Sequence, residues 1–474
     1  MTSTAGGGGI TVGMLIAQAR RSARLTQEQL AEASGLSVRA ISSIECGARC
    51  PRPFSLGRLA DALGLSEAQR ASLLELGDRR RRSGTVPPPE ALSHPAVTGL
   101  VGRGVEMAAL RDLVAGVGPA LVVIDGEPGM GKSRLLTEAM ALGTAAQVPV
   151  LAATCRRGAD PYAPIVDAIA DYALRRGPSI ARDLAGCHGM HLLLPEVADL
   201  VEAGSASRGS AAQTLAGAQG QERRLIFTAV SRLLANLAGA GRVLLVLDDL
   251  HWCGDDAADL LAHIIREGKG RVRVAVAARV GHVARAGRLA ACVADLARLG
   301  HLGRLRLDPL STVESAQLVS AVAAAVAASL PGAGEPGHER RRRILRLAGG
   351  LPLFLVELTR AAVAEPSAAR GDGVPASLRL AVIQQVASLP EPAPALLRQM
   401  AAFGRAVAIE HLAAGGLPLD ELLDALDTSR RHGLVAETRA GFQFRFPLVR
   451  VLVAESLGAT RARLWRLAAT TAVS

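Results

Sequence analysis

Two short stretches of the sequence carry residue types that could together bind a phosphate chain and its Mg²⁺ ion. The first, Gly126-Glu-Pro-Gly-Met-Gly-Lys-Ser133, follows the apolar run ALVVID and precedes RLLTEAMAL, so it reads as a turn between a strand and a helix. In G-x-x-x-x-G-K-S spacing the glycines let backbone amides point at an anion, the lysine neutralises β- and γ-phosphates, and the serine ligates Mg²⁺. The stretch therefore predicts binding of ATP with Mg²⁺ by Gly126, Glu127, Pro128, Gly129, Met130, Gly131, Lys132 and Ser133.

The second stretch, RVLLVLDDLHW, is an apolar run of strand length that ends in Asp248 and Asp249. A carboxylate at the carboxyl end of a parallel strand lies beside the phosphate loop, so Asp248 is expected to hold Mg²⁺ together with Ser133. Asp249 is the candidate for orienting the attacking water, and Arg279, at the end of VRVAVAAR, is placed to sense a γ-phosphate. The alternatives are a strand capped by two solvated acids and a simple surface arginine.

The elements that must position these residues follow from the pattern of apolar runs. From residue 98 to about 305, the runs ALVVID, PVLAAT, RVLLVLDD and VRVAVAAR alternate with helical stretches. This order predicts an α/β domain whose parallel sheet is covered by helices on both faces. From about residue 306 helical periodicity takes over, and the later segment LVAETRAGFQFRF has two short strand patterns flanking Ala440-Gly441, which suggests a winged helix.

Composition limits the class of protein. The chain has 474 residues, of which 49% are hydrophobic, 20% charged and only 2% aromatic, so helices rich in Ala, Leu and Val should dominate. We expect no window of about 18 strongly apolar residues and no signal peptide, which predicts a cytoplasmic protein that does not contact the membrane. The net charge of +11 favours contact with a polyanion but says nothing about fold.

The N-terminal stretch LTQEQLAEASGLSVRAISSIECG predicts two short helices joined by a tight turn. Thr26 and Gln29 have the spacing of a capping box at the start of the first helix. Gly35 permits a left-handed turn, and Ser37 can cap the second helix. With Leu30, Ala31, Ile41 and Ile44 facing inward, the residues left on the exposed face of the second helix are Val38, Arg39, Ser42 and Ser43.

Over about residues 12–66 this stretch resembles the XRE (Cro/repressor-type) helix-turn-helix family, whose pattern TQ-x-x-LA-x-x-x-G-h-S-x-x-x-I-S-x-x-E-x-G it matches. Such a second helix can enter the major groove of double-stranded DNA. The resemblance implies that Gln27 contacts phosphate and that the second helix reads bases. The candidate DNA-binding residues are Gln27, Ser37, Val38, Arg39, Ser42 and Ser43. The alternative is a helical interaction domain that has lost DNA binding.

A second resemblance covers about residues 98–460. The motifs LVGRGVE, GEPGMGKS, LDDLHW, GGLPLF and VPASLR occur in the order found in STAND signalling ATPases, a class related to AAA+ proteins, and the chain is similar to the ATPase portion of LuxR-type and antibiotic-pathway regulators. The resemblance implies that Gly102 and Arg103 lie near the base and ribose, that Pro352 packs on the adenine, and that a winged helix closes over the nucleotide.

The chain departs from that family at two places. At residues 251–254 it reads His-Trp-Cys-Gly where family members often read HWAD. It also has Phe446 where family members often have the histidine of FRHPLVRE. If that histidine helps to hold ADP, Phe446 removes the bond. The alternative is that Phe446 packs into the core of the winged helix.

The predicted fold is therefore multidomain, with an all-α helix-turn-helix domain, an α/β P-loop NTPase, a helical lid and a winged-helix domain. The predicted boundaries are a disordered tail (1–11), the helix-turn-helix domain (12–77), an Arg/Pro-rich linker (78–97), the ATPase domain (98–305), the lid (306–372), the winged helix (373–458) and a C-terminal helix (459–474).

The predicted function is a nucleoid-associated transcriptional regulator, expected to be a homo-oligomer, in which ATP binding and weak hydrolysis to ADP switch DNA binding or oligomerisation. Two alternatives remain at this point. One is an AAA+-type ATPase that remodels DNA, and the other is a non-catalytic scaffold in which the nucleotide is structural.

Overall fold

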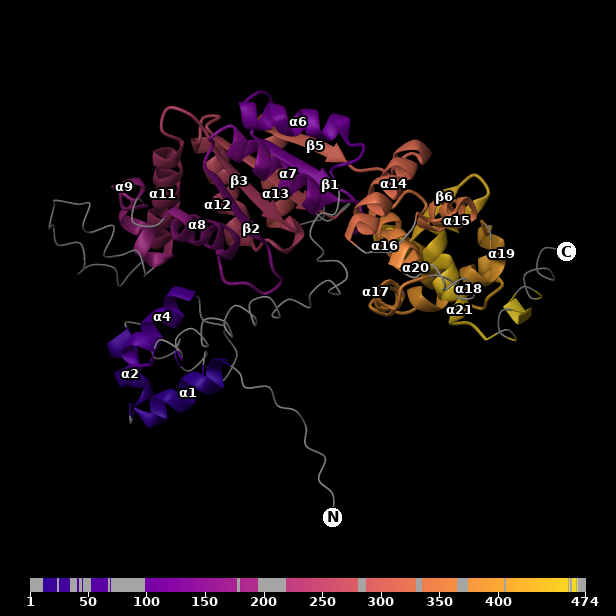
Figure 1. Cartoon of the computed structure of the whole chain (residues 1–474), viewed down its shortest axis with the longest axis horizontal. Coiled ribbons are helices and arrows are strands. Elements are labelled where there is room, and N and C mark those ends of the chain that lie inside the picture. The colour runs from indigo at the N-terminus through magenta and orange to yellow at the C-terminus, as the bar shows by residue number, and fades with distance from the viewer. Residues whose placement is uncertain are drawn as a thin grey trace, which may run out of the picture. The chain divides into compact units, whose positions relative to one another are not determined.

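The chain divides into two units, Met1–Ser93 and His94–Ser474, and each is described by itself. The computed structural model (Figure 1) describes residues 12–23, 25–34, 41, 45, 53–66, 69, 99–176, 180–194, 219–279, 287–329, 335–364, 374–404, 406–458, 460, 463–465 and 467. The predicted tail, the predicted linker and most of the predicted C-terminal helix lie outside the described residues.

The first unit contains helices α1 (Val12–Ser22), α2 (Gln27–Ser34) and α4 (Pro53–Ala62). The predicted capping box is confirmed at the start of α2, because the Thr26 amide donates to Gln29 Oε1 at 2.8 Å and the Gln29 amide donates to Thr26 Oγ1 at 3.1 Å. The inward positions predicted for this helix are also confirmed. The small core consists of Ile16, Leu30, Ala31, Ile41, Leu59, Ala60 and Leu63.

A partly buried polar cluster joins α1 to α2. Arg20 of α1 donates to both carboxylate oxygens of Glu45, at 2.6 Å from Nε and 2.8 Å from Nη2. Gln27, the first residue of α2, donates from Nε2 to Glu45 Oε2 at 2.8 Å. The hydrogen bonds from Arg20 hold the pKa of the Glu45 carboxyl below its usual range. One acid therefore ties α1 to the start of α2.

The second unit is built on a parallel sheet of five strands in the order β2-β3-β4-β1-β5. The strands are β1 (Leu121–Asp125), β2 (Val150–Thr154), β3 (Val243–Asp248), β4 (Val272–Ala278) and β5 (Leu302–Arg306). The first four coincide with the apolar runs of the sequence, so the predicted α/β fold with a parallel sheet is confirmed. Such runs are continuous because helices cover both faces.

The sequence pattern did not reveal β5. This strand, LGRLR, alternates apolar and charged residues and is only partly buried, because it lies at the edge of the sheet beside β1. Its two arginines, Arg304 and Arg306, interrupt the apolar run that marks the other four strands, including β2 at the opposite edge of the sheet.

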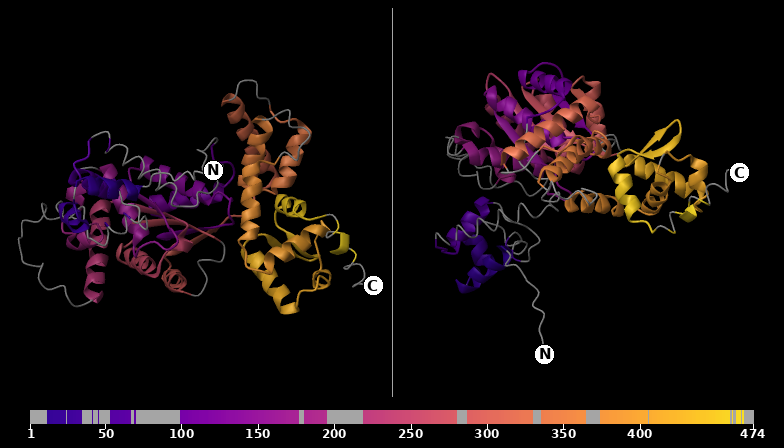
Figure 2. Two further views of the ribbon diagram at one scale, coloured as in Figure 1. Left: turned by 90° about the horizontal axis from the view of Figure 1, so that it is seen from below. Right: turned by 45° about the vertical axis from the view of Figure 1, so that its right-hand side comes forward.

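Side chains from the two faces of the sheet enter two separate cores. Val122 and Ile124 of β1 enter the first core, whereas Leu121 and Val123 enter the second. Helices α6 (Gly104–Ala115) and α7 (Lys132–Ala145) cover the first face. The second face is covered by α8 (Ala163–Arg176), α11 (Gln219–Ala238), α12 (Asp255–Glu267) and α13 (Arg288–Arg298). Figure 2 shows the resulting layers of helix, sheet and helix.

One short α-helix and two 3-10 helices complete the described part of the ATPase region. They are α9 (Ile180–Asp183), η3 (His188–Leu192) and η5 (Leu250–Trp252), the last of which follows directly on β3. Cys187, Met190 and Leu250 are buried in the second core, so these turns are packed rather than peripheral. Because η5 begins immediately after Asp249, it fixes the direction in which the chain leaves the two acids.

Helices α14 (Thr312–Ser329), α15 (His338–Ala348) and α16 (Pro352–Ala364) follow β5. They bury Leu318, Ile344 and Leu355 in the first core, which therefore continues from the sheet into the helices. By length and mean hydropathy (1.3), α14 could cross a membrane, a match that the sequence analysis did not anticipate. Four valines, one leucine and seven alanines give α14 this value, and its buried face packs in the first core.

The C-terminal region consists of α17 (Ala376–Ala387), α18 (Ala393–Phe403), α19 (Ile409–Ala413), α20 (Leu419–Arg431), an antiparallel hairpin and α21 (Pro447–Glu455). The hairpin pairs β6 (Val435–Thr438) with β7 (Gly441–Phe444), so its turn is Arg439-Ala440 and Gly441 belongs to the second strand. A Cβ on Gly441 would lie 2.3 Å from the Val407 carbonyl oxygen, where a bridge joins Val407 to Phe442. Helices followed by a hairpin are present, while a winged helix stays a prediction.

The pH dependence of the first unit tests the Arg20–Glu45 contact. The Glu45 pKa is lowered in the folded state, so its contribution to stability is present above its ordinary value of 4.5 and is lost as the pH falls through the lowered pKa. We expect Glu45→Gln in segment 1–93 to lower the free energy of unfolding at neutral pH and to flatten its decline in acid. Denaturant unfolding followed by circular dichroism between about pH 3 and about pH 7 measures this. Parallel acid profiles in the two proteins would contradict it.

Candidate nucleotide site

The loop between β1 and α7 has the backbone geometry of an anion cradle. Gly129 and Gly131 have φ values of 81° and 91°, which favour glycine because side chains rarely tolerate them. Helix α7 begins at Lys132, directly after Gly131, so its free N-terminal amides point toward the loop. The residues present therefore fit a bound phosphate chain.

Lys132 lies buried beneath this loop, with only 8% of its surface exposed. Its Nζ donates to the carbonyl oxygens of Gly126 at 2.8 Å and Glu127 at 2.9 Å. Burial lowers the pKa of the ammonium, while the nearby charges of Asp249 and Asp248 raise it. Two of its three N–H groups are thus bound to the loop, which leaves the third in position for a phosphate oxygen.

The two acids lie where β3 ends. The Asp249 amide donates to Asp248 Oδ1 at 2.8 Å, and Asp249 has a left-handed φ of 52°. Burial raises the pKa of the Asp249 carboxyl, and the adjacent charge of Asp248 raises it further. The charges of Asp249 and Asp248 also act on Lys132, so both acids lie near the phosphate loop, while their roles stay predictions. Ser133, the second residue of α7, is exposed and could hold Mg²⁺ together with Asp248.

Arg279 follows β4, which lies between β3 and β1 in the sheet. In parallel strands the carboxyl ends share one edge, so the end of β4 is between the two acids and the phosphate loop. The positive charge of Arg279 contributes to the pKa shifts of Glu127, Lys132 and Asp249. The structure therefore brings Arg279 together with the other predicted residues, although its role as a phosphate sensor stays a prediction.

Arg103 and Gly102 also lie near the loop. Arg103, which directly precedes α6, has a left-handed φ of 63° and donates from Nη2 to the carbonyl oxygens of Met130 at 3.3 Å and Asp308 at 2.8 Å. Gly102 has a φ of 69°, and a Cβ there would lie 2.6 Å from Glu314 Oε1. These contacts connect the start of α6 to the phosphate loop. Contact of either residue with a base or ribose stays a prediction.

Pro352 is the first residue of α16, and this helix meets the phosphate loop directly. The Leu353 amide donates to the Gly129 carbonyl at 3.2 Å, and a Cβ on Gly129 would lie 2.9 Å from Leu353 Cβ. The start of α16 is therefore packed against the loop. Stacking of Pro352 on adenine stays a prediction.

No role for Arg445 follows from the sequence motifs, and it lies next to the departure at Phe446. Arg445 Nη1 lies 3.0 Å from Oε1 of Glu127, the second residue of the loop, and forms an ion pair with it. Phe446 is 4% exposed and packs edge to face on Phe354 of α16, with ring centroids 5.9 Å apart. Phe446 is thus a packed core residue, but its ring contacts a helix of the predicted lid, so packing within a winged helix stays a prediction. The charge of Arg445 at the end of a strand pattern was the available signal.

Asp125, the last residue of β1, was also not assigned. Burial raises the pKa of its carboxyl, which the charges of Arg304 and Lys132 lower. Among the described residues, no hydrogen-bond partner is found for its buried Oδ1. The residue immediately before the loop therefore carries a buried carboxyl beside Lys132, whereas the apolar run ALVVID suggested only the end of a strand.

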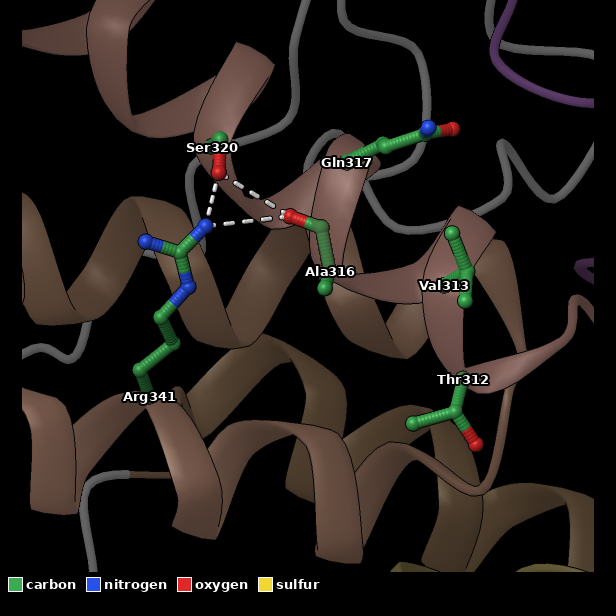
Figure 3. A pocket seen from close by; sticks show the side chains of 6 residues that line it. All are labelled: Thr312, Val313, Ala316, Gln317, Ser320 and Arg341. Carbon is green, nitrogen blue, oxygen red and sulfur yellow. Dashed lines mark hydrogen bonds between the residues drawn. The ribbon is translucent and has the colours of Figure 1, made fainter.

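A shallow groove of about 410 Å³ lies between α14 and α15, and none of the predicted nucleotide-binding residues lines it. Figure 3 shows Arg341 of α15 pointing across it toward α14. Arg341 Nη2 donates to the Ala316 carbonyl at 3.1 Å and to Ser320 Oγ. The groove is therefore the seam along which these two helices are joined.

The candidate DNA-binding residues are placed only in part. Gln27 is the first residue of α2 and is bound to Glu45, as described above. Ser37, Val38, Arg39, Ser42 and Ser43 lie outside the described residues, so DNA contact by all six stays a prediction.

Comparison with known proteins confirms both predicted domain types. Residues 99–277 match the AAA ATPase domain, and residues 16–69 match the helix-turn-helix domain. An uncharacterized helix-turn-helix-type transcriptional regulator of Sinorhizobium fredii is 43% identical over 58 residues, which are 12% of this chain and 75% of that protein. The narrower likeness to LuxR-type regulators is not addressed by these matches.

Similar solved structures include a Walker-type ATPase of Pyrococcus abyssi, with 14% identity, a TM-score of 0.49 and coverage of 75% of this chain and 96% of that chain. A STAND protein with a tetratricopeptide repeat sensor from Pyrococcus horikoshii has 14% identity and a TM-score of 0.33, covering 78% of this chain and 45% of that chain.

Replacing Lys132 tests the phosphate loop. We expect Lys132→Ala to weaken binding of MgATP roughly ten- to a hundredfold, because a charge-assisted contact to phosphate is lost. Isothermal titration calorimetry measures the affinity, and circular dichroism checks that the protein is folded. Arg134→Ala is the matched control, since Arg134 lies two residues further along α7 and pairs with Glu138 at 2.6 Å. Unchanged affinity in folded Lys132→Ala would rule out this site.

Replacing Asp248 tests the metal site separately. Asp248→Asn removes a negative charge but keeps the shape of the side chain, so we expect it to weaken chiefly the part of ATP binding that depends on Mg²⁺. Titrations of both proteins with Mg²⁺ and with a chelator measure this part. Should the difference between the two conditions be the same for Asp248→Asn and the parent protein, Asp248 does not hold the metal.

Proposed function

We propose that this chain, which belongs to the helix-turn-helix transcriptional regulators and carries an AAA ATPase domain, couples ATP binding to the binding of double-stranded DNA. The observation that supports ATP binding is the buried ammonium of Lys132. It is held under a loop of left-handed glycines at the start of α7. A buried lysine that faces an anion cradle is suited to a phosphate chain.

The residues at the strand ends divide the work on the nucleotide. Lys132 neutralises the β- and γ-phosphates, and Ser133 and Asp248 hold Mg²⁺, which stabilises the charge of the transferred phosphoryl group. Asp249 orients the attacking water and can accept its proton, a role that suits a carboxyl whose pKa is raised by burial. Arg279 senses the γ-phosphate. Hydrolysis in this scheme is slow and serves to end a signal.

The nucleotide acts as a switch through packing. In this proposal the lid (306–372) and the C-terminal domain (373–458), with the winged-helix fold that the sequence suggests, close over the nucleotide bound to residues 98–305. ATP and ADP can shift the equilibrium between closed and open forms only by binding them with different affinity. The open form then allows the chain to self-associate on DNA, which gives a homo-oligomeric regulator located at the cytoplasmic nucleoid.

DNA binding is assigned to the first unit. The helix predicted to follow Ser37 would enter the major groove of DNA. Arg39 would face a guanine edge, with Val38, Ser42 and Ser43 beside it. Ser37 and Gln27 would lie at the starts of the two helices, where backbone amides favour phosphates. The helix-turn-helix match over residues 16–69 supports this assignment.

Turnover separates the proposal from its two alternatives. We expect the full-length protein to hydrolyse ATP slowly, well below about 1 per second, with a change of DNA affinity between ATP and ADP. Phosphate release measured with and without duplex DNA, alongside fluorescence anisotropy of labelled DNA, provides both quantities. Fast turnover stimulated by DNA would instead indicate a remodelling motor. Nucleotide bound without turnover or effect on DNA would indicate a scaffold.

Replacing Arg39 tests the DNA half. We expect Arg39→Ala in segment 1–93 to cost about 1–3 kcal/mol at a specific site while leaving binding to unrelated duplexes nearly unchanged. Selection of binding sequences from a random duplex pool, followed by anisotropy titrations, measures both. An equal loss on every sequence would make Arg39 a phosphate contact. If segment 1–93 binds no duplex at low salt, the unit is an interaction domain.

A further inference from the structure

A buried ion pair joins the phosphate loop to the C-terminal region. Arg445 Nη1 lies 3.0 Å from Glu127 Oε1, and the two residues are 318 positions apart in the chain. The Glu127 side chain is 6% exposed and that of Arg445 is 22% exposed, so water screens the pair only weakly. The two residues belong to different parts of the second unit, the nucleotide loop and the end of the β6–β7 hairpin.

The backbone of the hairpin encloses the same carboxylate. Gly433, at the turn between α20 and β6, has a φ of 70°, and a Cβ there would lie 1.9 Å from Glu127 Oε2. Only a residue without a side chain allows this approach. The Arg445 amide donates to the Leu434 carbonyl at 2.9 Å, which fixes the base of the arginine beside that turn. Glu127 is therefore held from one side by a backbone surface and from the other by a guanidinium.

Helix α16 completes a three-part contact. It is bound to the loop through the Leu353 amide and Gly129, and it packs on the hairpin through Phe354 and Phe446. A Cβ on Gly349, just before α16, would lie 2.9 Å from Pro447 Cδ. The apolar part of this contact needs no charge. The ion pair adds a charged link to the backbone hydrogen bond between Leu353 and Gly129.

Removal of one partner has a predictable consequence. Burial raises the pKa of the Glu127 carboxyl, and among neighbouring charges Arg445 lowers it most. Without Arg445 the carboxylate stays buried with weaker compensation, which favours separation of the hairpin from the loop so that water can reach it. If Glu127 is neutralised as well, no buried charge remains that needs water. The effects of the two substitutions on opening of the hairpin are therefore expected to be non-additive.

We propose that the Glu127–Arg445 pair is a latch that holds the C-terminal hairpin closed on the phosphate loop, and that release of the latch speeds exchange of the bound nucleotide. The second clause rests on the function proposed above, whereas the first does not. Through this latch, a residue of the phosphate loop helps to hold the C-terminal region closed.

The closed state is tested in the nucleotide-free protein by hydrogen–deuterium exchange. Arg445→Gln should increase exchange several-fold in residues 126–132 and in the hairpin. The double variant Glu127→Gln/Arg445→Gln should exchange less than Arg445→Gln, because no unpaired charge remains buried. Arg430→Gln is the matched control, since Arg430 pairs with Glu437 of the same hairpin at 3.2 Å and both side chains are about half exposed. It should leave exchange at the loop unchanged.

Two outcomes would overturn the latch. One is wild-type exchange in Arg445→Gln, and the other is equal exchange in the single and double variants, which would mean that charge is unimportant. If Arg445→Gln does not fold, Arg445→Lys replaces it, since it keeps the charge and loses the planar fork. Arg445→Lys should then exchange faster than the wild type but more slowly than the double variant. Wild-type exchange in both Arg445→Lys and the double variant would contradict the proposal.

Nucleotide exchange is tested with a fluorescent ADP analogue in stopped-flow displacement. Release from Arg445→Gln should be about tenfold faster than from the wild type and from Arg430→Gln, as expected for loss of a charged hydrogen bond. Equal release rates would refute the effect on exchange. A wild type that binds no nucleotide would refute the proposed function, while the exchange measurements in the nucleotide-free protein would still decide the latch.

Discussion

The nucleotide site depends on one constraint, the parallel alignment of β3, β4 and β1 as neighbours in the sheet. Parallel strands place all their carboxyl ends at one edge, so Asp248, Arg279 and the phosphate loop meet there although they are far apart in sequence. Both faces of these strands are buried, and a shift of register would expose apolar residues and separate the charges. The packing that stabilises the sheet therefore also fixes the positions of the charged groups.

Much of this arrangement could be predicted because local signals agreed with global packing. The four buried strands are continuous apolar runs, the loop has its glycines at the two left-handed positions, and the capping box of Thr26 and Gln29 formed as expected. Each signal is short in sequence and has a single physical cause, namely burial, backbone freedom or an unpaired helix amide. The edge strand β5 lacked such a signal because solvent tolerates its charged residues.

The contacts that the sequence did not reveal all depend on residues distant in the chain. The Glu45 carboxylate is bound by Arg20 and Gln27, and the Glu127 carboxylate is bound by Arg445. A buried carboxylate needs a partner, but neither its spacing nor its neighbours in sequence identify that partner. Gly433 is a further example. Its turn contains no recognisable sequence motif, and glycine matters there because its backbone closely approaches the Glu127 carboxylate.

Phe446 stands where the STAND ATPases that the chain resembles often have a histidine. A phenylalanine ring cannot donate to a phosphate, and here it is packed on Phe354, so closure combines apolar packing with the Arg445–Glu127 pair. Glu127 takes part in two interactions at once, because its carbonyl accepts from Lys132 while its carboxylate binds Arg445. A phosphate that draws the Lys132 ammonium toward itself must alter the hydrogen bond to that carbonyl. Glu127 thus connects Lys132, through its backbone carbonyl, with Arg445, through its side-chain carboxylate.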